Sequence, residues 1–255
     1  MRDVKTAAWG VLAGLLLMIP LSSAASDDQK GKPRRQVVES QNQQSAAAVN
    51  MPVYVPPPRG SPGGRVGGSS RGPEDTLPMV SVLTPDHTGL TVHEQPSLYW
   101  YLSKSTTYPI ELTITDERAI QPILERRISG PVQPGVQRVR LADYGIRLSL
   151  EVPYRWFVAL VVDPDNQSRN VIAGGFIERI ALPEGRRAQL ARAGKPQVPS
   201  IYAEAGLWYD ALAAISDLID AAPDDRALRQ QRASLLEQVG LPQIAEHEMR
   251  LSRAQ

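Results

Sequence analysis

Two short segments contain residue types that carry catalysis in other proteins. His93-Glu94 begins like the zinc-binding pattern H-E-x-x-H, but the second histidine is missing, and Pro96 would disrupt the helix that the pattern needs. Residues 68–72 read Gly-Ser-Ser-Arg-Gly and fit the pattern G-x-S-x-G, whose serine must sit on a tight turn between a strand and a helix. The flanking sequence favours neither element. Both matches are therefore accidental, and an esterase or metal hydrolase is only the third hypothesis for this chain.

The other titratable residues do not form a catalytic or metal-binding set. His87 and His93 would be joint metal ligands only if their loop folded suitably, and no further ligands cluster beside them. Asp143, Asp163 and Glu178 stand singly at turns or next to arginines, without the paired carboxyl groups of general acid–base catalysis. The chain has no cysteine, which excludes thiol catalysis and cysteine-ligated zinc. We expect no catalytic, cofactor or metal site, and so a protein that is not an enzyme.

Residues 1–25 have the features of a secretory signal peptide. Basic residues precede an apolar run from Ala7 to Leu21, and small residues follow it. The run is shorter than the roughly 20 residues that a membrane-spanning helix needs. We predict cleavage after Ala24 or Ala25, with an uncleaved anchor as the alternative. The sequence therefore predicts a bacterial protein exported to the periplasm, the cell surface or the extracellular space, which meets the membrane only transiently through its signal peptide.

Residues 26–75 are predicted to be a disordered linker rich in proline, glycine and arginine. They lack apolar periodicity, and such a composition buries too little apolar surface to offset the entropy cost of ordering. Pro56–Pro58 adds polyproline II character. The alternative is an extended arm that lies along the folded domain or along a partner. Export and a net charge of only +1 argue against nucleic acid as that partner.

A series of strand patterns occupies residues 76–182. Leu98–Leu102 is a run of large apolar and aromatic residues bounded by Pro96 and Ser103, which favours a buried strand. Further strands are predicted over Pro109–Asp116, Ile123–Ile128, Val136–Leu141, Ile146–Val152, Arg155–Asp163 and Asn170–Ile180. About seven short strands separated by turns are typical of an immunoglobulin-like or fibronectin-III-like β-sandwich. A β-barrel is the alternative.

Two of these strands carry more specific expectations. Arg155–Asp163 is the most apolar run after the signal peptide, so we expect a central strand that is buried on both faces. Tyr154, just before it, resembles the tyrosine corner of sandwich folds, in which the tyrosine hydroxyl ties the incoming loop to the strand.

Five short motifs are spread over the chain from about residue 54 to the carboxyl terminus, and they are specific only in combination. They are Tyr54–Gly60, His87–Thr91, Gln95–Tyr101, Tyr154–Trp156 and Gly175–Arg179. Together they resemble an exported bacterial family catalogued as domain of unknown function 928. The resemblance implies an exported protein, and it brings no catalytic residues that can be carried over.

Residues 183–255 change to a helical period. Trp208–Ala222 places large apolar residues on one face, and further helices are predicted over Ser200–Ala205, Arg226–Val239 and Pro242–Arg253. Gly206 and Gly240 lie 34 residues apart, which is the tetratricopeptide period. We therefore expect a helical tail of about one and a half tetratricopeptide-like repeats, docked on the sandwich. An unrelated helical hairpin is the alternative.

The resemblance to tetratricopeptide repeats also implies a binding face. In such repeats the first helix of each pair lines the concave, ligand-binding side. By that resemblance, the partner-binding residues here would be Gln230, Ser234 and Glu237.

Two functions compete for this chain. The first is a non-enzymatic envelope protein that binds another envelope or secreted protein, as an interaction or scaffold module. The second is a glycan-binding module of the cell surface, in which exposed Tyr99, Tyr101 or Tyr108 would stack on sugar rings. Exposed, coplanar aromatic rings on one sheet would favour the second.

Overall fold

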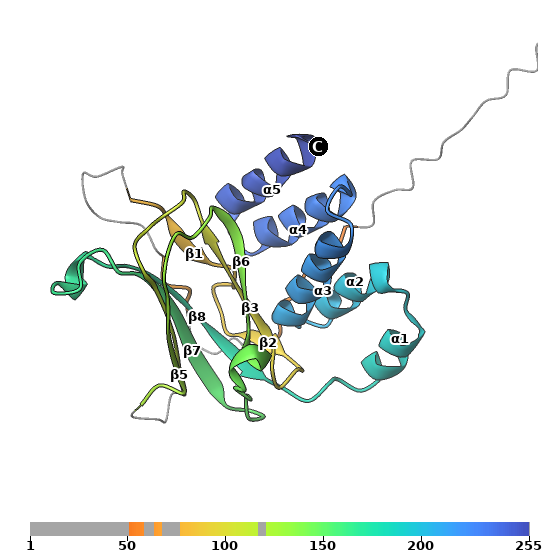
Figure 1. Ribbon diagram of the computed structural model, residues 1–255. Helices are drawn as coiled ribbons and strands as arrows, with labels where there is room; N and C mark the ends of the chain where they lie inside the picture. Colours follow the sequence, from red (N-terminus) through yellow and green to blue (C-terminus); the bar gives the residue numbers. More distant parts are fainter. Residues whose placement is uncertain (1–50, 59–63, 68–76, 117–120, 255) are drawn as a thin grey trace, which may run out of the picture. The chain divides into compact units, whose positions relative to one another are not determined.

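The chain forms two β-sheets followed by a set of helices, as the prediction of a mainly β fold with an α tail requires (Figure 1). The computed structural model describes residues 51–58, 64–67, 77–116 and 121–254. The predicted signal peptide and the first half of the predicted linker lie outside these residues. In the described segments, no helix is both long enough and apolar enough to cross a membrane.

The smaller sheet is built around the predicted aromatic strand. It contains β1 (Val80–Val82), β3 (Ser97–Leu102) and β6 (Gly135–Arg140), in the order β1-β3-β6, with antiparallel pairing throughout. All six residues of β3 are buried. Trp100 and its neighbours on one face belong to the core between the sheets, whereas Tyr101 on the other face contacts the ring of His247 in a C-terminal helix, with centroids 5.1 Å apart. Both faces of this strand are therefore covered.

The larger sheet has the strand order β2-β8-β7-β4-β5. Its strands are β2 (Gly89–Thr91), β4 (Ile110–Asp116), β5 (Leu124–Ile128), β7 (Pro153–Leu160) and β8 (Val171–Arg179). Among these five strands, β2 and β8 pair in parallel and the other neighbours pair antiparallel. The prediction of a central strand from Arg155 is confirmed, since this segment forms β7 in the middle of the sheet. The prediction that both faces of this strand are buried is wrong. Trp156, Val158 and Leu160 are buried, whereas the outward-facing Arg155 is exposed, since none of the described helices or strands covers that face of β7.

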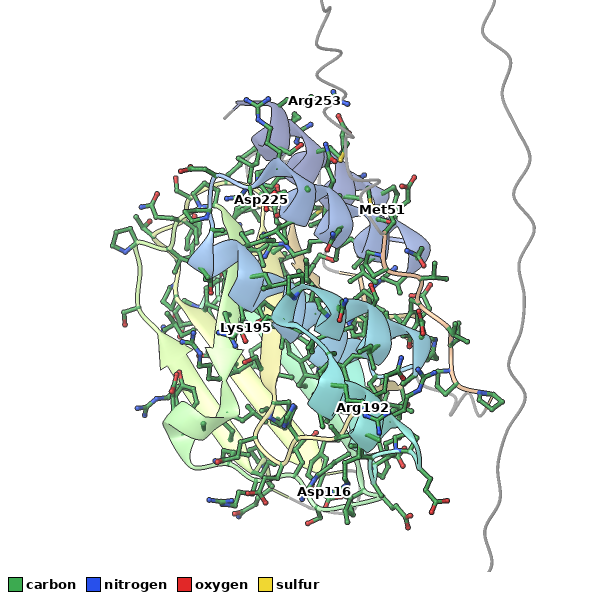
Figure 2. All side chains as sticks on the ribbon, turned by 90° about the vertical axis from the view of Figure 1, so that its right-hand side faces the viewer. Met51, Asp116, Arg192, Lys195, Asp225 and Arg253 are labelled. Atoms are coloured by element: carbon green, nitrogen blue, oxygen red, sulfur yellow. The ribbon has the colours of Figure 1, made fainter. Side chains whose placement is uncertain are left out.

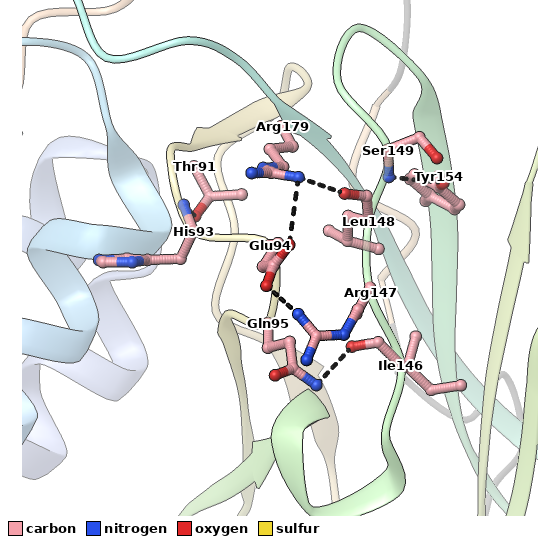
Figure 3. A network of polar contacts seen from close by, with 10 residues as sticks. All are labelled: Thr91, His93, Glu94, Gln95, Ile146, Arg147, Leu148, Ser149, Tyr154 and Arg179. Carbon is pink, nitrogen blue, oxygen red and sulfur yellow. Dashed lines mark hydrogen bonds and ion pairs between the residues drawn. The ribbon is translucent and has the colours of Figure 1, made fainter.

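The prediction of a strand over Ile146–Val152 is also wrong, since this segment is an irregular loop (Figure 3). Leu148 donates its N–H to the Glu94 carbonyl at 2.8 Å, outside any named strand. Glu151 has a φ of 58°, and this left-handed conformation interrupts an extended backbone. Leu150 is consequently 51% exposed, although a strand would have placed it on the same face as the buried Leu148.

The same loop is tied to the sheet by polar contacts on both sides (Figure 3). The Tyr154 hydroxyl accepts a hydrogen bond from the Ser149 N–H at 3.1 Å, which is the link between loop and strand that the sequence predicts for this tyrosine. Arg179 donates to the Leu148 carbonyl at 3.0 Å. Glu94 pairs with Arg179 at 3.8 Å.

The helical region begins after the last strand. The α-helices are α1 (Arg186–Arg192), α2 (Val198–Glu204), α3 (Trp208–Ala221), α4 (Arg226–Gln238) and α5 (Pro242–Ala254). Short 3₁₀ turns occupy Leu141–Tyr144, Gln167–Arg169 and Lys195–Gln197. The positions of α2 to α5 confirm the predicted helices, whereas α1 was not predicted. Asp225 caps α4 by accepting the Ala227 N–H at 2.9 Å, as its place before the helix indicates.

Two helix–turn–helix units, α2–α3 and α4–α5, are built alike. Their turns contain Gly206 and Gly240, both with a φ of 73°, a conformation that glycine adopts at little cost. In each turn the following leucine, Leu207 or Leu241, donates its N–H to the carbonyl five residues earlier at 2.9 Å. The 34-residue offset in the sequence is therefore also an offset between equivalent turns.

The first turn of α3 joins the helices to both sheets. The indole N–H of Trp208 donates to the Leu83 carbonyl at 2.8 Å. The Tyr209 hydroxyl accepts the indole N–H of Trp156 at 2.8 Å and donates to the Phe176 carbonyl at 2.9 Å. In the described residues, sheets and helices consequently share one core and form one compact unit.

Candidate functional site

A groove of about 600 Å³ runs between α4 and α5. On α4 it is lined by Gln230, Ser234 and Glu237, which are the three predicted partner-binding residues and follow one another at helical spacing. The other residues that line it are Met51, Ala233, Pro242, Ala245, Glu246, Met249, Arg250 and Arg253. Figure 2 faces the helices and labels Met51 and Arg253 on this part of the molecule. The three residues therefore lie together along one wall of this groove, and their role in binding a partner stays a prediction.

The groove combines small apolar residues with charges of both signs. Ala233 and Ala245 are buried, and their small side chains let α4 and α5 lie close together. Glu246 and Arg250 form an ion pair at 3.0 Å on the α5 side, and Glu237 is exposed on α4. A surface with mixed charge and small apolar contacts suits a polypeptide segment better than a small apolar ligand.

A buried ion pair fixes the two walls of the groove. Nη2 of Arg232 in α4 lies 2.8 and 2.9 Å from the two carboxylate oxygens of Glu248 in α5. Arg229 approaches the same carboxylate at 3.7 Å, and Ser216 of α3 accepts a bond from Arg232 at 3.2 Å. The relative position of α4 and α5 is therefore set by directional bonds as well as by apolar packing.

The segment from Met51 to Pro58 lies against the helices, next to the groove. Tyr54 donates its N–H to Oε1 of Gln238 at 2.8 Å, and Nε2 of the same glutamine donates to the Pro52 carbonyl at 2.9 Å. Residues 51–58 therefore belong to the folded unit rather than to a linker. This is the extended-arm arrangement that the sequence left as an alternative, and we call the segment the arm.

One side chain anchors the arm. Tyr54 is buried against Trp208 in an edge-to-face contact, with ring centroids 5.2 Å apart, and its hydroxyl oxygen lies 2.9 Å from Nε2 of His87. Burial raises the pKa of the Tyr54 phenol and lowers the pKa of His87. Both groups are thus kept neutral, so the imidazole nitrogen can accept a hydrogen bond from the phenol O–H. Val55 adds a bond from its N–H to the Ala203 carbonyl at 3.0 Å.

Residues 64–67 form a second contact between the predicted linker and the folded unit. Arg65 donates to the carbonyls of Thr84, Val239 and Gly240 at 2.8, 3.1 and 3.0 Å. Val66 pairs with Gly174 of β8 as an isolated bridge. A guanidinium group with several backbone acceptors holds the sheet and the end of α4 together.

The two histidines of the candidate metal site have separate roles. His87 contacts Tyr54, whereas Nε2 of His93 lies 3.7 Å from Asp210 of α3. Asp210 is buried and accepts the Thr91 hydroxyl at 2.8 Å and the Val92 N–H at 2.9 Å. Burial raises the pKa of Asp210 to about 6, against the opposing effects of His93 and these hydrogen bonds. In the part of the chain that the structure describes, no cluster of three or more metal-ligating side chains is found.

The aromatic residues proposed for sugar stacking differ in exposure. Tyr99 and Tyr101 are 1% and 5% exposed, so neither presents a ring face to solvent, whereas Tyr108 is 40% exposed.

The remaining catalytic candidates were an isolated carboxylate and a serine motif. The carboxylate of Asp163 forms an ion pair with Arg169 at 3.5 Å. The G-x-S-x-G match at residues 68–72 lies outside the described residues.

Sequence reasoning missed the part of the site that comes from distant segments. Met51, Arg250 and Gln238 were not predicted, because their roles depend on how the arm and α5 pack on α4. One signal was present, since Tyr54 is the only aromatic residue between positions 26 and 75. A single aromatic residue among prolines indicates an anchoring side chain.

Comparison with known proteins identifies the family of this chain. No curated protein matches it. A crystal structure of a multi-domain immunophilin from Arabidopsis thaliana covers 70% of this chain and 95% of its own, with 6% identity and a TM-score of 0.17, values that carry no argument about fold or function. Residues 66–249, well over half of the chain, match the family described as Domain of Unknown Function (DUF928). The chain therefore belongs to the DUF928 family.

Proposed function

We propose that this protein is a non-enzymatic interaction module, which binds a segment of another envelope or secreted protein in the groove between α4 and α5. The observation that carries the proposal is the convergence of Gln230, Ser234 and Glu237 with side chains of α5 on one groove of about 600 Å³. The proposal includes export through the amino-terminal signal peptide and a periplasmic or extracellular location in a bacterium.

The proposal also extends to the architecture. We assign the two sheets to an immunoglobulin-like or fibronectin-III-like sandwich, and the bond from Ser149 to the Tyr154 hydroxyl supports this assignment. We assign α2 to α5 to tetratricopeptide-like repeats, supported by the equal φ of 73° at Gly206 and Gly240. In such an arrangement α4 is the first helix of its pair and offers its outer face to a ligand.

A photo-crosslinking experiment on the full chain tests the proposed function. A photoreactive amino acid is placed at Gln230 in the groove or, as a matched control, at the exposed Glu125 on β5. The proposal predicts a discrete protein adduct from position 230 that is absent from position 125 and is depleted by Glu237→Lys. Identical adducts from both positions, or adducts insensitive to Glu237→Lys, would contradict it.

A further inference from the structure

We propose that α2, α3 and α4 form a peptide-recognition site for an extended segment with a tyrosine between prolines, and that the chain's own arm occupies this site in cis. The site adjoins the groove at Met51 and Ser234 but contacts the arm through other residues, chiefly Gln238, Ala203 and Trp208. The inference therefore does not depend on the groove having a partner.

The main chain of the arm is held by bonds that any extended peptide can form. The Gln238 side chain accepts the Tyr54 N–H and donates to the Pro52 carbonyl, so its amide bonds the peptide backbone in both directions. The Ala203 carbonyl accepts the Val55 N–H at 3.0 Å. Main-chain bonds of this kind supply affinity in peptide recognition, while side-chain pockets supply specificity.

Gln238 is itself positioned for this role. Its Nε2 also lies 3.1 Å from the Ser234 carbonyl and 3.2 Å from the Ser234 hydroxyl oxygen. These contacts, one turn earlier on α4, orient the amide so that its oxygen faces the arm's N–H. An oriented amide loses less side-chain entropy when a peptide binds.

The side chains of the arm alternate between buried and exposed, and the buried ones are Pro52 and Tyr54. Tyr54 is buried between Trp208 and His87, whereas its neighbours Val53 and Val55 are 59% and 49% exposed. The backbone alternation of an extended segment thus directs Pro52 and Tyr54 towards the folded unit and the valines beside Tyr54 to solvent. The edge-to-face contact with Trp208 requires an aromatic side chain at this position of the peptide. Nε2 of His87, 2.9 Å from the hydroxyl oxygen, favours an aromatic side chain that carries a hydroxyl group.

Glycine and proline residues allow the close approach. A Cβ on Gly206 would lie 3.0 Å from the Val55 carbonyl oxygen, so the missing side chain leaves room for the arm. Pro52 and the prolines of 56–58 restrict the free peptide to extended conformations, which reduces the entropy lost on binding. These features define the ligand class as an extended peptide with a tyrosine flanked by prolines.

Covalent connection makes the arm a strong competitor for its own site. An attached segment has an effective concentration on the order of millimolar, so a free peptide must compete against it. We therefore expect the site to accept a partner's peptide only when the arm is displaced, which makes the arm an autoinhibitory ligand.

The test uses the full chain and a fluorescent peptide with the sequence MPVYVPPP of residues 51–58. Tyr54→Ala weakens the arm and leaves the receiving residues unchanged. By fluorescence anisotropy, the peptide should bind this variant saturably and bind the wild-type chain at least tenfold more weakly. A peptide with alanine in place of its tyrosine should not bind. Absence of binding to a folded Tyr54→Ala chain, or equal binding to both chains, would overturn the proposal.

Two variants on α4 provide the matched control. Added to Tyr54→Ala, Gln238→Ala should weaken peptide binding at least tenfold, and Gln230→Ala in the neighbouring groove should change it less than twofold. Equal effects of the two substitutions on peptide binding would count against recognition by Gln238.

If Tyr54→Ala does not fold, hydrogen exchange tests the proposal instead. The Tyr54 and Val55 amides should be protected in the wild-type chain and should lose protection in Gln238→Ala. Unprotected amides in the wild-type chain would refute the proposal.

Discussion

Arg232 and Glu248 face each other between α4 and α5 as a buried ion pair, with Nη2 bonded to both carboxylate oxygens at 2.8 and 2.9 Å. Replacing Glu248 with alanine would leave the guanidinium group buried without its main partner. Removing one member of such a pair costs about 3–5 kcal/mol. We expect Glu248→Ala to lower the free energy of unfolding by about that amount, measured by urea denaturation.

A double variant separates the pair from the packing around it. Arg232→Met with Glu248→Leu removes both charges and keeps the volume, so it should recover most of the stability lost in Glu248→Ala. A loss of less than about 1 kcal/mol in the single variant would instead match a solvent-exposed pair and would contradict the buried contact described above.

Gly89 on β2 should not tolerate a side chain, because a Cβ there would lie 2.6 Å from Cε2 of Tyr209. The Tyr209 ring cannot move aside without disturbing the bonds of its hydroxyl to Trp156 and Phe176. Gly89→Ala is expected to cost about 1–3 kcal/mol, as overpacking of a core does. Gly67→Ala is the control, since no atom lies within 4 Å of a Cβ at that position. Similar losses in both variants by thermal denaturation would disprove this account.

Asp210 should make stability depend on pH. Burial raises its pKa from 3.8 to about 6, so in this range the folded state binds a proton more tightly than the unfolded state. Its contribution is therefore fully present below about pH 3.8 and is lost as the pH rises towards about 6. His93 and Tyr202 are the neighbouring titratable groups, and both remain in an Asp210→Asn variant.

The measurement is the stability of wild-type protein minus that of Asp210→Asn between pH 4 and pH 7. We expect this difference to fall with rising pH by on the order of 3 kcal/mol at most. A difference that is flat, or that rises with pH, would show that the carboxyl group is not held in the buried environment described for it.

Gly206 and Gly240 have the same φ but different neighbours, which predicts unequal effects of alanine. The left-handed backbone should cost each variant about 1 kcal/mol. At Gly206 the new Cβ would also lie 3.0 Å from the Val55 carbonyl, whereas at Gly240 the nearest atom is 3.6 Å away. Gly206→Ala should therefore be less stable and should speed hydrogen exchange at the Val55 amide. Equal stability and unchanged exchange would mean that the arm does not depend on this glycine.

The sequence predicted those elements whose apolar pattern is long and regular. β4 alternates along seven residues and α3 keeps one apolar face over fourteen, so burial and backbone geometry agreed with the pattern. β1 and β2 have three residues each, too few to show a period. Ile146–Val152 has the alternation of a strand, but Glu151 turns the backbone into the left-handed region, and alternation cannot reveal that.

The site was predictable only in part, for a related reason. The resemblance to tetratricopeptide repeats pointed to Gln230, Ser234 and Glu237, and their helical spacing on α4 puts them along one groove. The opposite wall and the arm come from segments whose position depends on tertiary packing. Tyr54 shows the limit most clearly, because its neighbours have the composition of a linker while its own ring is buried against Trp208.

The role of the groove in binding a partner is tested most directly by comparing two charge reversals on the same protein. Glu237→Lys changes the groove, and Glu125→Lys makes the same change on the exposed edge strand β5. Calorimetric titration with the partner crosslinked at Gln230 should show at least tenfold weaker binding for Glu237→Lys and less than twofold change for Glu125→Lys. Equal affinity of wild-type protein and both variants would contradict the assignment of this groove as the binding site.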